Sequence, residues 1–108
     1  MRIYALKSCD TCKKAIKALQ AAGYDPQITD VRSDGVSPDE IARFLAAFGD
    51  TLVNRASTTW RGLSESDRVR TPGELLTEYP TLMKRPVIDA DGKLFLGWKA
   101  DVQKALLG

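Results

Sequence analysis

Residues 7–23, KSCDTCKKAIKALQAAG, decide the fold of this chain, because they join a strand pattern to a helix pattern through two cysteines. Apolar side chains recur at helical spacing after Cys12, and Gly23 is a typical helix terminator, so a helix is predicted from about residue 11 to residue 22. Residues 2–6, RIYAL, form a short apolar run that is typical of a buried strand. The two cysteines therefore lie where the strand gives way to the helix.

A second strand and a helical segment follow. Residues 27–31, QITDV, indicate a strand that is parallel to the first if the helix between them is a crossover. The sequence SPDE at residues 37–40 combines an N-cap serine, a proline at the first helical position and a capping-box glutamate. A similar start, TPGE, stands at residues 71–74, and SESD at residues 64–67 is a looser one. Residues 37–80 are therefore predicted to be largely helical.

The last part of the chain predicts a hairpin and a helix. Residues 86–88 and 93–96 are separated by DADG at residues 89–92, a turn sequence that closes β-hairpins. Residues 100–107 add a short amphipathic helix. The element order is that of an α/β, thioredoxin-like fold. We expect a single domain, residues 1–108, with a four-stranded mixed sheet and a helical insertion between strands 2 and 3.

The charge balance limits the kinds of partner. Sixteen basic and fourteen acidic residues in 108 give a formal net charge of +2, too balanced for a general nucleic-acid or membrane-surface binder. The N-terminal apolar run is too short for a signal peptide, and no stretch approaches the roughly 18 consecutive apolar residues of a membrane span. We therefore expect a cytoplasmic protein. In that reducing compartment, a Cys-x-x-Cys pair indicates redox chemistry or metal binding rather than a structural disulfide.

The position of Cys9 predicts a reactive thiolate. If Cys9 stands just before the first helical turn, unpaired backbone N–H groups and the positive end of the helix dipole stabilise its thiolate and lower its pKa. Lys13 follows within one turn and adds positive charge. Cys12, one turn further along, is near enough to attack a mixed disulfide formed on Cys9. The pair can therefore supply a nucleophile and a resolving thiol.

Two other interpretations of the cysteines are open. Both thiols could simply pack as small hydrophobic side chains. A zinc site needs about four ligands, whereas the chain has two cysteines and no histidine, so a metal would require carboxylates or a second subunit. The lack of histidine also excludes a Cys–His dyad and a Ser–His–Asp triad. A reactive thiolate must therefore be activated by backbone and cations, and we predict no metal site.

Three sequence motifs carry a resemblance that covers essentially the whole chain. They are IYALKSCDTCKKA at residues 3–15, LVNRASTTWRGL at residues 52–63, and KRPVI at residues 84–88 with LGW at residues 96–98. Together they resemble the arsenate reductase family. More narrowly, they are similar to its small bacterial branch of glutathione-dependent reductases, which is related to the Spx-type transcriptional regulators.

The resemblance implies roles for individual residues. Cys9 falls on the catalytic cysteine of the family, which attacks the oxyanion in the arsenate reductases. Arg85 falls on an arginine at the start of the third strand and would orient the anionic partner. The resemblance implies that Pro86 is held in the cis form beside the nucleophile.

Two departures from the family pattern argue against arsenate as the substrate. Two further oxyanion-binding arginines of the arsenate reductases fall on Ala56 and Trp98. A neighbouring cation does not replace the planar fork of an arginine without movement of the backbone. Arg85, with Arg55 or Arg61, would still suit a single carboxylate such as one of glutathione.

The leading hypothesis is a thiol–disulfide oxidoreductase of the arsenate reductase family. It needs no bound cofactor, it uses glutathione as a co-substrate, and glutathione, thioredoxin or glutaredoxin restores its reduced state. We expect a monomer with neither a nucleic-acid nor a membrane partner. The candidate substrate-binding residues are Arg55, Arg61, Pro86 and Lys13.

The alternative belongs to another functional class. In a redox-switched regulator of the Spx type, a Cys-x-x-Cys disulfide changes the affinity for RNA polymerase. The central TTWR motif at residues 58–61 and the lack of an extended C-terminal segment are closer to the reductase branch.

Overall fold

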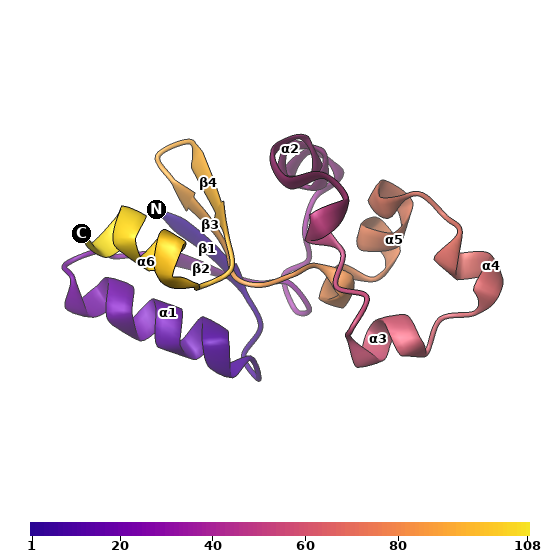
Figure 1. Cartoon of the computed structure of the whole chain (residues 1–108), viewed down its shortest axis with the longest axis horizontal. Helices are drawn as coiled ribbons and strands as arrows, with labels where there is room; N and C mark the ends of the chain where they lie inside the picture. The colour runs from indigo at the N-terminus through magenta and orange to yellow at the C-terminus, as the bar shows by residue number, and fades with distance from the viewer. The chain divides into compact units, whose positions relative to one another are not determined.

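The computed structural model describes residues 1–108 and contains six α-helices and one four-stranded β-sheet (Figure 1). The chain divides into two compact units. Residues 1–34 and 85–108 form the first unit, and residues 35–84 form the second. The first unit holds all four strands and two of the helices, and the second holds the other four helices.

The sheet of the first unit is mixed, as predicted. Its order is β2-β1-β3-β4, and its strands are β1 (Arg2–Ala5), β2 (Gln27–Asp30), β3 (Val87–Ala90) and β4 (Lys93–Leu96). β1 pairs with β2 in parallel and with β3 antiparallel, and β3 pairs with β4 antiparallel. β1 lies between β2 and β3, and three of its four residues are buried.

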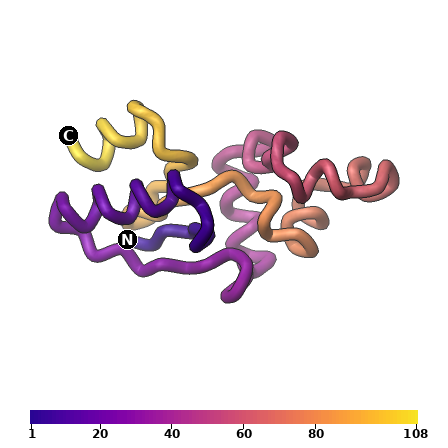
Figure 2. The backbone as a smooth tube through the Cα atoms, turned by 90° about the horizontal axis from the view of Figure 1, so that it is seen from below, coloured from indigo at the N-terminus to yellow at the C-terminus, as the bar shows by residue number.

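Helices α1 (Asp10–Ala21) and α6 (Ala100–Leu107) lie side by side over one face of this sheet (Figures 1 and 2). α1 connects the parallel strands β1 and β2, which is the crossover that a βαβ unit requires. This topology and element order are those of a thioredoxin-like fold, so the predicted fold class is confirmed. The core between the two helices and the sheet is apolar and consists of Ile3, Ala15, Leu19, Ile88, Val102 and Leu106.

The second unit is helical, and in the sequence it comes between strands β2 and β3, where an insertion is predicted. Its longest helix, α2 (Pro38–Phe48), begins at the predicted capping box. The Ser37 hydroxyl accepts from the Glu40 N–H, and the Glu40 carboxylate accepts from the Ser37 N–H, both over 3.1 Å. α5 (Pro72–Glu78) also begins with a proline in its first turn, and it packs against α2.

Two one-turn helices lie between α2 and α5. They are α3 (Thr58–Arg61) and α4 (Glu65–Arg68), and each begins after a serine whose hydroxyl accepts a hydrogen bond from the third residue along. The sequence predicts the start of α4, whose first turn is acidic, but not that of α3, whose first turn has no acidic residue. Two 3-10 turns complete the unit, at Gly49–Leu52 and Pro80–Leu82.

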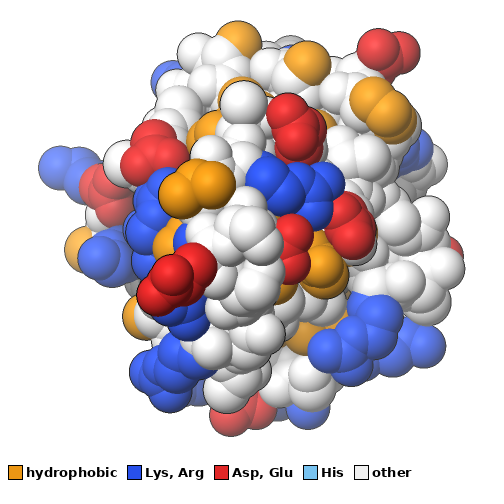
Figure 3. All heavy atoms as spheres, turned by 90° about the vertical axis from the view of Figure 1, so that its right-hand side faces the viewer, with side chains coloured by type: hydrophobic (Ala, Val, Ile, Leu, Met, Phe, Trp, Pro, Cys, Tyr) orange, Lys and Arg blue, Asp and Glu red, His pale blue; other side chains and the backbone are white.

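Basic and acidic side chains are interspersed on the face of the molecule shown in Figure 3. The second unit contains an ion-pair cluster in which Arg70 meets three carboxylates, those of Asp67, Glu74 and Glu78. None of the helices combines the length and the apolar character that crossing a membrane requires. Whether the two units behave as a single domain stays a prediction.

Candidate active site

Cys9 is the N-cap residue of helix α1, directly before its first turn. Its backbone is extended, with φ −86° and ψ 112°, and its N–H donates to the Leu6 carbonyl over 2.9 Å. The Cys9 carbonyl accepts the Lys13 N–H over 3.1 Å, which starts the helical ladder. The Cys9 sulfur takes the place of a capping oxygen, since it accepts the Cys12 N–H over 3.3 Å.

The surroundings of Cys9 favour its thiolate. Partial burial alone would raise the pKa of the Cys9 thiol. Hydrogen bonds from the side chain and the backbone N–H of Cys12, together with the positive charge and a hydrogen bond of Arg85, outweigh this effect. The net result is a pKa of Cys9 below the ordinary value of a cysteine.

Cys12 has the opposite character. Its side chain is 0% exposed, and burial is the largest cause that raises its pKa to about 12. Its thiol also donates to Cys9, which holds the proton in place. Both cysteines are reduced, so the pair consists of one activated thiol and one buried, protonated thiol. Because Cys12 has no exposed surface, the sulfur within its reach is that of Cys9.

Arg85 and Pro86 lie immediately before strand β3, and the peptide bond between them is cis, as the family resemblance implies. Pro86 is fully buried, and its carbonyl accepts the Gly97 N–H over 2.8 Å. The charge of Arg85 acts on both Cys9 and Cys12. The fold therefore brings the predicted nucleophile, the predicted resolving thiol and the predicted arginine together at one point of the first unit.

The other predicted substrate-binding residues are not part of this cluster. Lys13 is exposed on the first turn of α1. Arg55 and Arg61 belong to the second unit. Arg55 forms a two-pronged ion pair with Asp50, with N–O distances of 2.8 and 2.9 Å, and its guanidinium lies 5.1 Å from the centre of the Trp60 ring. A substrate anion would therefore have to compete with the Asp50 carboxylate for Arg55, and the binding roles of Arg55, Arg61 and Lys13 stay predictions.

A buried carboxylate that the sequence motifs do not predict binds the loop that precedes Cys9. Asp30, the last residue of β2, is 8% exposed and accepts three backbone hydrogen bonds. The donors are Lys7 in the loop before Cys9, over 3.2 Å, and Arg32 and Ser33, over 2.9 and 3.0 Å. The Ser33 N–H, joined by the other two, lowers the pKa of Asp30 despite its burial. An aspartate at a strand end followed by a polar turn is the local signal that indicates this role.

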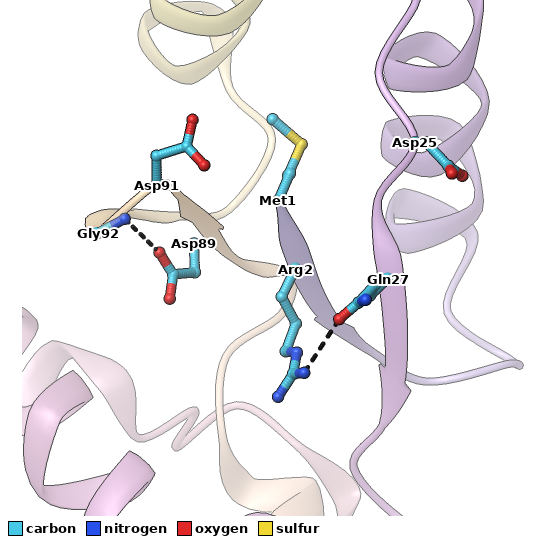
Figure 4. Close-up of a pocket in the computed structure, with 7 residues that line it drawn as sticks. All are labelled: Met1, Arg2, Asp25, Gln27, Asp89, Asp91 and Gly92. Atoms are coloured by element: carbon cyan, nitrogen blue, oxygen red, sulfur yellow. Dashed lines mark hydrogen bonds between the residues drawn. The ribbon is translucent and has the colours of Figure 1, made fainter.

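Two pockets of the first unit lie near opposite ends of strand β1. One, of about 190 Å³, is lined by Leu6, Lys7, Ser8, Asp30, Arg32 and Ser33, next to the nucleophile in sequence. The other, of about 390 Å³, lies at the start of β1 and includes the carboxylates of Asp25, Asp89 and Asp91 (Figure 4). Nowhere do three or more cysteine, histidine or acidic side chains come together in a way that could hold a metal ion.

Comparisons with known proteins identify the family of this chain. The model of the ArsC family matches residues 4–106. An uncharacterized protein of Haemophilus influenzae is 41% identical over 101 residues, which cover 89% of each chain. Two solved structures are also similar. The YFFB protein has a TM-score of 0.90 and 32% identity, covering 99% of this chain and 98% of its own.

The second solved structure, an arsenate reductase (ArsC) related protein from Brucella melitensis, has a TM-score of 0.72 and 38% identity, covering 96% of this chain and 91% of its own. The family model spans both the Cys-x-x-Cys segment and the segment with Arg85 and Pro86. Sequence and fold therefore agree, and this chain belongs to the ArsC family.

Proposed function

We propose that this protein is a thiol–disulfide oxidoreductase in which Cys9 is the nucleophile. The observation that carries the proposal is the pairing of an activated Cys9 thiol with a buried, protonated Cys12 thiol, joined by the 3.3 Å hydrogen bond from the Cys12 N–H to the Cys9 sulfur. A nucleophile with a lowered pKa and a nearby second thiol are the two parts that disulfide exchange needs.

The first step is an exchange of one disulfide bond for another. The Cys9 thiolate attacks one sulfur of the substrate disulfide, a sulfur–sulfur bond forms on Cys9, and the bond in the substrate breaks. The second substrate sulfur leaves as a thiolate and takes a proton from water. Arg85 lies close enough to Cys9 to hydrogen-bond to it, so its charge also suits an anionic group carried by the substrate.

Cys12 completes the reaction in the second step. Once Cys9 is part of a mixed disulfide it carries no negative charge, so one of the causes that raise the pKa of Cys12 disappears. Cys12 then attacks the Cys9 sulfur, its proton goes to the departing thiolate, and a Cys9–Cys12 disulfide remains. The substrate has gained two electrons from the protein and two protons, one from water and one from Cys12.

Two molecules of glutathione, or one dithiol of a thioredoxin or glutaredoxin, would return the protein to its reduced state. Glutathione suits this site better than arsenate does, because Arg85 is the arginine beside the nucleophile and a single carboxylate needs fewer fixed donors than arsenate. We place this reaction in the cytoplasm and assign it to a monomer. The redox-switched regulator stays a prediction, and a polymerase pull-down that depends on oxidation would favour it.

The proposal is tested by an intact-mass titration of the full chain in glutathione buffers of stepped potential. We expect a Cys9–glutathione adduct or a Cys9–Cys12 disulfide within the cytosolic range of about −320 to −220 mV. Cys12→Ser should trap the adduct, and Cys9→Ser should form neither product. Two thiols that remain reduced and unmodified over the whole range would overturn the proposal.

A further inference from the structure

The pocket of about 190 Å³ at the end of strand β1 has two walls. Leu6, Lys7 and Ser8 form one wall, and this segment leads directly into Cys9. Arg32 and Ser33, in the turn after strand β2, form the other. A molecule in this pocket therefore lies next to the loop that carries the reactive sulfur.

Asp30 ties these two walls together. One of its carboxylate oxygens accepts the Lys7 N–H, and the other accepts the N–H groups of Arg32 and Ser33. The carboxylate is buried and uses its lone pairs within the protein, so little of its negative charge is available to a ligand. The pocket thus has a fixed frame whose shape depends on a satisfied internal network.

The exposed charged side chains that line the pocket are positive. Lys7 and Arg32 both line it and are exposed. Asp34 and Asp10 are not among the lining residues, so Asp30 is the one carboxylate of the lining against these two cations. The pocket therefore favours an anionic group over a cationic one.

The size of the pocket limits the ligand further. Sites that enclose a whole drug-sized molecule measure roughly 300–1,000 Å³. At about 190 Å³, this pocket has room for the end of a small peptide but not for a complete cofactor. A ligand that reacts at Cys9 and places a carboxylate here must carry both groups a short distance apart.

We propose that this pocket binds the carboxylate-bearing end of a small thiol or disulfide substrate, with Lys7 and Arg32 as the residues that select for its negative charge. The inference rests on the proposed role of Cys9. It adds the two residues, Lys7 and Arg32, that recognise the negative charge of the substrate. It assigns the site to small acidic disulfides of the kind that short thiol peptides form, in preference to neutral or cationic ones.

A matched pair of reagents tests this inference. Dithiodipropionate and its diamide have nearly the same size and the same disulfide, but only the first carries carboxylates. The rate of adduct formation on Cys9 is measured for each by intact mass, in a Cys12→Ser background that keeps the adduct from being resolved. The combined variant Lys7→Gln and Arg32→Gln is compared with Lys17→Gln, which removes an exposed charge from α1 outside the pocket.

We expect the combined variant to slow the reaction with dithiodipropionate about fivefold, because two exposed charges contribute modestly, and to leave the diamide rate unchanged. Lys17→Gln should change neither rate by as much. The inference is overturned if the combined variant slows both reagents equally or neither, or if Lys17→Gln has the same effect on dithiodipropionate. If neither reagent modifies Cys9 at all, the proposed function fails, which is a different result.

Discussion

The backbone N–H of Cys12 lies 3.3 Å from the sulfur of Cys9 and donates a hydrogen bond to it, so the residue that would resolve the disulfide also activates the nucleophile. The helix enforces this arrangement, because an N-cap side chain meets the N–H groups of the first turn. The spacing of two intervening residues therefore does more than bring the two sulfurs close together. It also lowers the pKa of Cys9 and places Cys12 in the buried part of the first turn.

The first prediction concerns the pH dependence of Cys9. Its alkylation by iodoacetamide should follow a titration with a midpoint below that of a free cysteine, which is about 8.5, because the thiolate is the reacting species. Cys12 should not react in the folded protein. Rates measured at a series of pH values, with the modified residue identified by peptide mass, check both points. A Cys9 midpoint at or above that of free cysteine would contradict the site geometry.

A second prediction isolates Arg85. Replacing it with glutamine removes the positive charge and a hydrogen bond that favour the Cys9 thiolate, so the midpoint of Cys9 alkylation should move to higher pH. Arg85→Lys keeps the charge and should move it less. Thermal unfolding of both variants serves as the control for folding. If Arg85→Gln leaves the midpoint in place, Arg85 acts on the substrate alone or not at all.

The order of strands and helices could be predicted because each element carries a local pattern. The apolar run at β1, the crossover helix α1 and the capping box at Ser37 are signals that extend over a few neighbouring residues. Helix α3 could not be predicted, since its one turn is too short to have a period and, unlike that of α4, has no acidic residue to mark its start. Local chemistry therefore determined most of the fold class.

The candidate site depended on a different kind of information. The helix-capping position of Cys9 follows from its neighbours, but the approach of Arg85 does not, because it is set by the pairing of β3 with β1. The family resemblance, not the local pattern, pointed to Arg85. Asp30 was missed because its function lies in three backbone hydrogen bonds, which become visible only when Lys7 and the turn after β2 meet.

A third prediction tests this Asp30 network through acid stability. The folded-state pKa of Asp30 is lowered, so its contribution to stability is fully present above the pKa of an unfolded aspartate and is lost as the pH falls through the folded-state value. Asp30→Ala leaves three backbone N–H groups without their acceptor, which should cost about 2–3 kcal/mol at neutral pH.

Urea unfolding at several pH values checks this prediction. The difference in unfolding free energy between wild type and Asp30→Ala should shrink as the pH is lowered into the acid range. Asp25→Ala is the matched control, because Asp25 is exposed and lies before β2 rather than at its buried end. A difference that is independent of pH would mean that the ionised carboxylate is not what holds the loops together.

The last prediction concerns whether the two units unfold together. The first unit is made of residues 1–34 and 85–108, which the second unit connects, so an unfolded second unit would leave a long flexible loop whose closure costs about 3 kcal/mol or more. We therefore expect one cooperative transition.

Two variants test this expectation. Leu19→Ala, in the core of the first unit, should lower the free energy of unfolding by about 2–5 kcal/mol, and Ser37→Ala, at the cap of α2, should lower it by about 1 kcal/mol. Both should lower the midpoint of the same transition. Calorimetry of both variants decides the matter, because two separate transitions, each shifted by only one of the substitutions, would show that the units are independent domains.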